Sequence, residues 1–340
     1  INLTVGQPNF PIPNLIKKAA IKAINNNLNS YVQTTGIKEL KDAVSNKLLK
    51  KNKIKAKPED IIITSAVSGG LSIALDALID PNDEVIIFDP FFVAYLQVIR
   101  LKNGKPIVVK TNPDYTINYE DLNSKISKKT KAIIINSPNN PTGKVYSEKE
   151  LRKLAQIAKK NKITIISDEI YEDFVYDSEH FSVGSIYNNT ISLFGFSKSH
   201  SMTGWRVGYM TGPKEIIQEC VKSQQFNFVC SPTPFQYAAV EALKIDMSKY
   251  IKDFKKKRDF VYSELKDYYE IIKPEGAFYM FIKSPYNTDE FIQDCIKNKL
   301  LVVPGKTFSK KNTHFRISFS NEMDVLKRGV EVLKELSNKN

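Results

Sequence analysis

Residues 132–169 read AIIINSPNNPTGKVYSEKELRKLAQIAKKNKITIISDE. The runs AIIIN (132–136) and ITIIS (163–167) are apolar without polar alternation, which is typical of strands buried on both faces. Between them the helical pattern begins at Ser147, which can cap a helix, and Glu150 completes a capping box. This strand–helix–strand order predicts a parallel sheet covered by helices, and hence an α/β fold.

The same alternation of strand-like and helical patterns continues on both sides of this unit. The pattern changes after a long helical stretch over about 247–269. Short strand-like runs then occur at 277–282, 300–304 and 314–320, around a helix near 288–298. We therefore expect a large domain over 15–249 and a small domain formed by 1–14 and 250–340. Further strand-like runs of the large domain lie at 61–64, 84–88, 106–109 and 190–196.

Composition excludes several classes of protein. The 340-residue chain has a net charge of +13, but its lysines are scattered among Asn and Glu, which argues against a nucleic-acid partner. The most apolar stretch, from Val85, is interrupted by Asp89 and Pro90, so no membrane span is predicted. The three cysteines are far apart and form no disulfide framework or metal motif, which favours a cytoplasmic protein.

Polar residues follow three of the predicted strands. Asn140 comes shortly after the first quoted strand, Asp168 directly after the second, and Lys198 after the run that ends at Phe196. They are about thirty residues apart, roughly one strand–helix–strand unit, so adjacent strand ends can bring them into one crevice. A lysine beside a carboxylate and an amide fits an aldehyde cofactor with a pyridine ring and a phosphate, namely pyridoxal phosphate. Burial and the cationic Arg206 would lower the pKa of the Lys198 amine so that it can react.

Three motifs carry a resemblance to a known family. The chain resembles the class I/II aminotransferases of pyridoxal-phosphate fold type I at FSKSHSMTGWRVGY (196–209), NSPNNPTG (136–143) and SDEIYE (167–172). The resemblance implies a large domain with a mostly parallel seven-stranded sheet between helices, plus a smaller α+β domain. Further similarity occurs, in family order, at LTVGQPNFPIP (3–13), YVQTTGIKELKDAV (31–44), EGAFYMF (275–281), VVPGKTF (302–308) and HFRISFS (314–320).

The resemblance assigns residues to the cofactor's ring. Lys198 would bind the cofactor covalently and then move the substrate's proton, so it is the predicted catalytic residue. Asp168 would keep the pyridine nitrogen protonated, which lets the ring draw electrons from the substrate. Asn140 and Tyr171 would form hydrogen bonds with the phenolic oxygen, and Phe92 would stack on the ring.

The resemblance also predicts a phosphate site. Arg206 would bind the cofactor phosphate through its planar guanidinium, and Ser197 would add a hydroxyl. Backbone N–H groups of Val67 and Ser68, at a strand-to-helix turn, would complete it. Tyr31 matches a tyrosine that reaches the phosphate in the neighbouring subunit, which implies a homodimer.

Substrate residues are predicted at both ends of the chain. Arg316 would pair with the substrate's α-carboxylate, with Asn140 beside it, and Gly6 would let the N-terminal segment close over the substrate. The three histidines, His180, His200 and His314, lack metal-ligand spacing, so no metal is predicted.

The implied function is that of an aminotransferase. It would move an amino group between an L-amino acid and a 2-oxo acid in two half-reactions, with aspartate or an aromatic amino acid as one partner and the pair of glutamate and 2-oxoglutarate as the other. Substrate choice stays open, because no second arginine for a side-chain carboxylate is evident and Ser68 stands where some aspartate-preferring relatives carry lysine. A C–S β-lyase would use the same residues, and a non-catalytic regulator on an aminotransferase-like domain is a third alternative.

Overall fold

A seven-stranded sheet forms the centre of the protein in the computed structural model, which describes residues 1–337. The strand order is β1-β7-β6-β5-β4-β2-β3, and the links among β3, β2, β4, β5 and β6 are parallel, whereas β7 pairs antiparallel with both β6 and β1. The strands are β1 (Ile61–Thr64), β2 (Glu84–Asp89), β3 (Lys105–Lys110), β4 (Thr130–Asn136), β5 (Thr164–Asp168), β6 (Thr190–Gly195) and β7 (Gly208–Thr211).

Both faces of this sheet are covered by helices. Alternate residues of one strand belong to different clusters: Ile134 packs with α3, α4 and α8, whereas Ile133 and Ile135 pack with α5 and α6 on the other face. This explains why the strands read as uninterrupted apolar runs. The helices of this part are α1 (Asn14–Asn25), α2 (Lys38–Lys47), α3 (Ala66–Leu78), α4 (Val93–Leu101), α5 (Tyr119–Lys125), α6 (Glu148–Asn161), α7 (Phe196–Ser199), α8 (Lys214–Asn227) and α9 (Thr233–Ala242).

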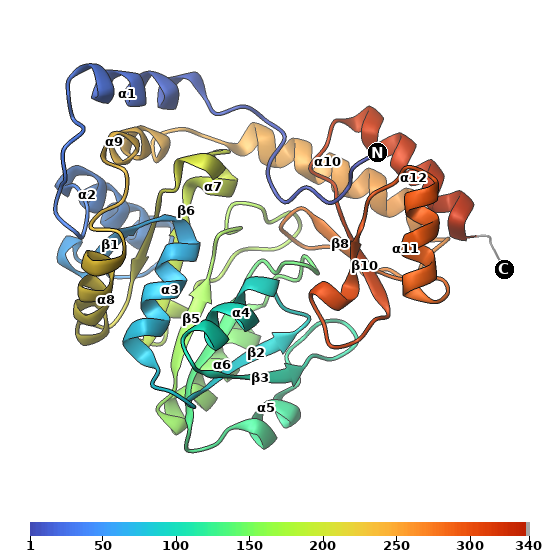
Figure 1. Cartoon of the computed structure of the whole chain (residues 1–340), viewed down its shortest axis with the longest axis horizontal. Coiled ribbons are helices and arrows are strands. Elements are labelled where there is room, and N and C mark those ends of the chain that lie inside the picture. Colours follow the sequence, from blue (N-terminus) through green and yellow to red (C-terminus); the bar gives the residue numbers. More distant parts are fainter. Residues whose placement is uncertain (338–340) are drawn as a thin grey trace.

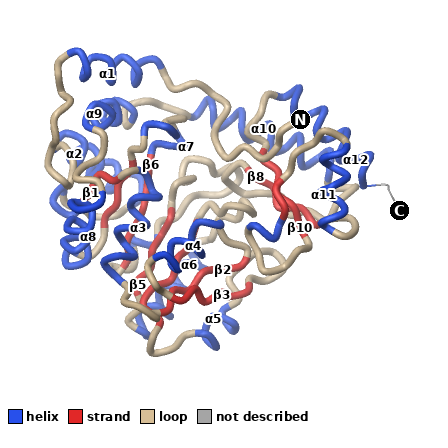
Figure 2. The backbone as a smooth tube through the Cα atoms, in the orientation of Figure 1, coloured by secondary structure: helices blue, strands red, loops and turns tan. Residues whose placement is uncertain are grey.

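A second, smaller sheet lies beside the first, as the two groups of red strands in Figure 2 show. Its antiparallel order is β8-β10-β9, and the N-terminal segment runs along it before α1, because Leu3 exchanges backbone hydrogen bonds with Leu301 and Ser318 (Figure 1). Its elements are α10 (Ser248–Leu265), β8 (Tyr279–Lys283), α11 (Thr288–Lys297), β9 (Val303–Pro304), β10 (His314–Ser318) and α12 (Met323–Ser337).

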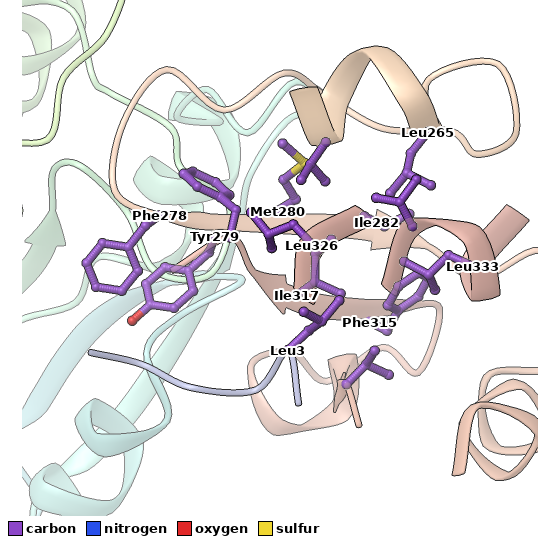
Figure 3. Close-up of a cluster of buried hydrophobic side chains, with 14 of the residues drawn as sticks. Leu3, Leu265, Phe278, Tyr279, Met280, Ile282, Phe315, Ile317, Leu326 and Leu333 are labelled. Carbon is purple, nitrogen blue, oxygen red and sulfur yellow. The ribbon is translucent and has the colours of Figure 1, made fainter. Parts of the chain in front are cut away.

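The second sheet has an apolar cluster of its own, shown in Figure 3. Leu3 from the N-terminal segment, Leu265 from α10 and Leu333 from α12 pack with residues of β8 and β10. A core shared by the first residues and the last ninety supports the expected division into domains, whose boundaries stay a prediction. Short helical turns are η1 (Leu48–Asn52), η2 (Pro58–Asp60), η3 (Val183–Ser185), η4 (Thr203–Trp205) and η5 (Gly305–Thr307).

The fold class predicted from the sequence is confirmed, and one local prediction is met in detail. The Ser147 hydroxyl accepts a hydrogen bond from the Glu150 backbone N–H, and the Glu150 carboxylate accepts one from the Ser147 N–H, so the capping box is present. Strand β7 was not predicted, because its four residues, Gly208–Thr211, do not form a recognisable apolar run. No helix within residues 1–337 is long and apolar enough to cross a membrane.

The turn after β4 is held against the loop that precedes β8. Gly143 has φ +71°, its carbonyl accepts hydrogen bonds from Glu275 and Gly276, and a Cβ there would lie 2.5 Å from a side-chain atom of Pro274. Only glycine fits this position without a shift, since both its dihedral angle and its surroundings exclude a side chain.

We expect Gly143→Ala to lower the free energy of unfolding by at least about 2 kcal/mol, through backbone strain and steric overlap. Urea denaturation followed by circular dichroism measures the change. Gly204→Ala is the matched control, because a Cβ at Gly204 has no neighbour within 4 Å and its φ is not positive. Equal stability of the two variants would contradict this account of the turn.

Candidate active site

A cavity of about 390 Å³ opens where the carboxyl ends of β4 and β5 and the β6–α7 turn approach the second sheet. A larger cavity of about 610 Å³ lies behind α7, but neither Lys198 nor Arg316 lines it. The smaller cavity is lined by Gly6, Ala66, Val67, Ser68, Phe92, Val93, Tyr95, Asn136, Asn140, Asp168, Ile170, Tyr171, Ser197, Lys198, Thr203, Arg206, Tyr279, Val303, Thr307, Phe308 and Arg316. Every predicted site residue except Tyr31 is among them.

Lys198 lies on the four-residue helix α7 directly after β6. Its ammonium donates a hydrogen bond to the Gly6 carbonyl, with 2.6 Å between nitrogen and oxygen. Burial lowers the pKa of Lys198 from 10.5 to about 8; the charges of Arg206 and Arg316 act in the same direction, and Asp168 opposes them. About a tenth of this amine is therefore neutral at pH 7, far more than for an ordinary lysine.

Asp168 ends β5 and is 4% exposed. The Tyr95 hydroxyl donates to its Oδ2 at 2.6 Å, and the Ile170 N–H donates to Oδ1 at 3.2 Å. Burial raises the pKa of Asp168 to about 6, while these hydrogen bonds pull it down. Tyr95 was not predicted from the sequence; the available signal was its position three residues after Phe92, the N-cap residue of α4, and the two rings meet edge to face.

Arg316 reaches the cavity from β10 of the second sheet and is buried. Its Nη1 donates to Asn140 Oδ1 at 3.0 Å and its Nη2 to the Thr4 carbonyl at 2.8 Å. The guanidinium lies 4.3 Å from the ring centre of Tyr279 and 4.8 Å from that of Phe308. Four residues from separate segments thus hold its plane in one orientation.

Tyr171 contacts a second tyrosine that the sequence reasoning missed. The hydroxyl oxygens of Tyr171 and Tyr279 are 3.0 Å apart, and both side chains are buried. Burial raises the pKa of both phenols, so both stay protonated at neutral pH. Tyr279 lies within the family motif at 275–281. The alternation of side-chain directions along a short strand does not distinguish a cavity residue from a core residue.

One end of the cavity is rich in hydrogen-bond donors. Ala66, Val67 and Ser68 form the first turn of α3, so their N–H groups have no partner within the helix. The Ser197 hydroxyl is buried and has no hydrogen-bond partner within the described part of the chain. Arg206 lines the same cavity and is anchored by a 3.0 Å hydrogen bond to the Thr203 carbonyl.

Tyr31 lies outside this cavity. Its side chain is 82% exposed, so a role at the phosphate requires a second subunit and stays a prediction. Potential metal ligands gather elsewhere, where Glu169, Glu172 and His180 lie within 4.8 Å of one another. His180 contacts Glu169 at 2.7 Å and Glu172 pairs with the Lys47 ammonium, so each of the three side chains has a protein partner.

Comparison with known proteins finds relatives over nearly the whole chain. The family model "Aminotransferase class I and II" matches residues 1–333. A probable aspartate aminotransferase of Methanocaldococcus jannaschii is 36% identical over 99% of this chain and 93% of its own length. The (5-formylfuran-3-yl)methyl phosphate transaminase of the same organism is 38% identical over 100% of this chain and 92% of its own.

Solved structures agree with the sequence matches. The aromatic aminotransferase of Pyrococcus horikoshii superimposes with a TM-score of 0.96 at 34% identity and covers 99% of this chain and 95% of its own. The aspartate aminotransferase of Thermotoga maritima gives a TM-score of 0.96 at 35% identity, over 100% and 92%. The predicted family, fold and class of enzyme are confirmed, and the chain belongs to the class I and II aminotransferases.

Proposed function

We propose that the protein uses pyridoxal phosphate to move an amino group between an L-amino acid and a 2-oxo acid. The observation that carries the proposal is the cavity that brings together a half-buried lysine of lowered pKa, a buried carboxylate and a buried arginine, namely Lys198, Asp168 and Arg316. Such a set suits a cofactor that reacts with amines and a substrate that carries a carboxylate.

The residues present fit the cofactor. The unpartnered Ser197 hydroxyl, the first turn of α3 and Arg206 offer donors for a phosphate at one end. Asp168, whose ionised form is destabilised by burial, would gain a cationic N–H partner in the pyridine ring. Phe92 offers an aromatic face, and Asn140 and Tyr171 offer polar groups for the phenolic oxygen.

Each side chain then has a defined task. Pyridoxal phosphate, when bound, supplies an aldehyde that reacts with amino groups and a ring that withdraws electrons from the substrate's α-carbon. Lys198 binds the cofactor as a neutral amine, yields its place to the substrate's amino group, and moves the proton from the substrate's α-carbon. Arg316 binds the α-carboxylate, and because its plane is fixed it orients the Cα–H bond.

The names of the relatives guide the choice of substrate. Because they include aspartate and aromatic aminotransferases, we propose an aspartate or aromatic amino acid as one substrate, with glutamate and 2-oxoglutarate as the second pair. The first 2-oxo acid leaves before the second enters, since the amino group stays in the site between the two half-reactions. Gly6 lies over Lys198 and lets the N-terminal segment approach the substrate.

A cytoplasmic homodimer is part of the proposal. The three cysteines are free, which suits a reducing compartment. The N-terminal part of the protomer exposes a group of apolar and aromatic side chains of the kind that a partner covers. These are Leu15, Ile21, Ile24, Leu28 and Tyr31.

Lys198 provides the direct test of the proposed function. The protein mixed with pyridoxal phosphate should show a visible absorbance band, and one amino acid added without an oxo acid should change the band and release one equivalent of 2-oxo acid. Lys198→Ala should lose at least about 10³-fold in turnover.

Lys257→Met is the control for that experiment, because Lys257 is a buried lysine paired with Asp253 and lies outside the cavity. Full turnover by Lys198→Ala would refute the mechanism. Pyruvate and ammonia released from cysteine would instead favour a β-lyase.

Asp168 should lower the stability of the cofactor-free protein. Its pKa rises from 3.8 to about 6 on folding, so the folded protein binds more protons between these values and the free energy of unfolding falls as pH increases through this window. We expect Asp168→Asn to be more stable than the parent by about 1–3 kcal/mol at pH 7, and by much less at pH 4. Urea denaturation at both pH values, without cofactor, measures the difference, and a gap independent of pH would contradict it.

Tyr31 tests the dimer. Tyr31→Phe should weaken cofactor binding by about tenfold without changing the sedimentation coefficient, because it removes one hydrogen bond to a charged phosphate supplied across the interface. Ile21→Glu should lower both the sedimentation coefficient and the affinity for cofactor. Cofactor affinity unchanged in a monomeric Ile21→Glu would rule out a contribution of the partner to the site.

A further inference from the structure

Tyr279 lies where three parts of the cavity meet. It belongs to β8 and is 1% exposed, and its hydroxyl lies at the edge of the apolar cluster in Figure 3. The hydroxyl contacts Tyr171 at 3.0 Å, and the ring lies 4.3 Å from the Arg316 guanidinium. A Cβ added at Gly6 would lie 3.2 Å from the same hydroxyl, so the N-terminal segment also rests on it.

The direction of the hydrogen bond between the tyrosines follows from the proposed role of Tyr171. Either hydroxyl can be the donor in the isolated pair, because each carries one hydrogen. If Tyr171 uses its hydrogen to bind the cofactor's phenolic oxygen, its oxygen is left as an acceptor. Tyr279 must then donate, and the two bonds form a chain from Tyr279 through Tyr171 to the cofactor.

We propose that Tyr279 is a positioning residue: its hydroxyl strengthens the hydrogen bond that Tyr171 donates to the cofactor, while its ring holds the Arg316 plane. This inference rests on the proposed function. Hydrogen bonds in such a chain polarise one another, most effectively where water is excluded. The hydroxyl of this side chain therefore serves the cofactor's phenolic oxygen, and its ring serves the arginine that binds the substrate's carboxylate. A pair of substitutions at Tyr279 can separate the two contributions.

The hydroxyl and the ring predict different measurements. A donor at the phenolic oxygen stabilises its negative charge, and so favours loss of the proton shared with the lysine-bound nitrogen. Weakening that donor should raise the pKa that the visible absorbance of the lysine-bound cofactor reports. Removing the ring should instead release Arg316 and raise the KM for the amino acid.

The experiment is a double-mutant cycle on the cofactor-loaded protein without substrate. Absorbance titration should show a pKa higher by about 0.3–0.5 unit for Tyr279→Phe and by about 1–2 units for Tyr171→Phe. In the Tyr171→Phe background, Tyr279→Phe should add no further shift, because the chain is already broken. KM for the amino acid should stay within about twofold for Tyr279→Phe and rise about tenfold or more for Tyr279→Leu.

Tyr176→Phe is the matched control, since Tyr176 is another buried tyrosine, bonded to the Ala277 carbonyl and outside this cavity. It should leave the absorbance pKa unchanged. An unshifted pKa in Tyr279→Phe, or an equal shift with and without the Tyr171 hydroxyl, would overturn the role of Tyr279 and leave the proposed function intact. Absence of a Lys198-dependent band in the parent protein would overturn the proposed function itself.

Discussion

The concentration of positive charge in one cavity is the constraint on which the rest of the site depends. Three cationic side chains, Lys198, Arg206 and Arg316, line a space of about 390 Å³, and Asp168 is the carboxylate that faces them. Arg316 is buried, Lys198 is half-buried and Arg206 is exposed, so the cost of gathering like charges falls mainly on the first two, and the pKa of Lys198 is lowered to about 8. The remaining imbalance favours anions, and a phosphate and an α-carboxylate are the two groups that the proposed reaction brings.

The two sheets must be held together for this cavity to exist. Asp168 ends β5 of the large sheet and Lys198 lies on α7 directly after β6, whereas Arg316 belongs to the small sheet. The N-terminal segment joins them, because the Thr4 carbonyl accepts from Arg316 and the Gly6 carbonyl accepts from Lys198. Backbone carbonyls thereby satisfy donors on both cations, so one short extended segment would influence both the proposed cofactor attachment and the proposed substrate binding.

Much of this arrangement could be predicted from the sequence, for physical reasons. Parallel strands of one sheet end at a common edge, so Asn140, Asp168 and Lys198 were expected to meet from their spacing alone. Tyr95 and Tyr279 escaped prediction because a buried tyrosine is equally compatible with a core. Strand β7 was not predicted, because it has only four residues, which follow the left-handed backbone conformation at Arg206 and are too few to show a periodic pattern. Contacts between the two parts of the protein, such as Arg316 with Asn140, depend on packing that no local pattern encodes.

Asn140 shows how the geometry resolves two roles that the sequence analysis assigned to one residue. Its Oδ1 accepts from Arg316 at 3.0 Å, and its backbone N–H donates to the Asn136 side chain at 2.8 Å. The amide nitrogen Nδ2 is therefore the group with which Asn140 would donate to the cofactor's phenolic oxygen, while its oxygen orients the arginine. An aspartate at this position would keep the acceptor and lose the donor. Asparagine is thus the side chain of this size that could serve the cofactor and the substrate at once, as proposed for Tyr279.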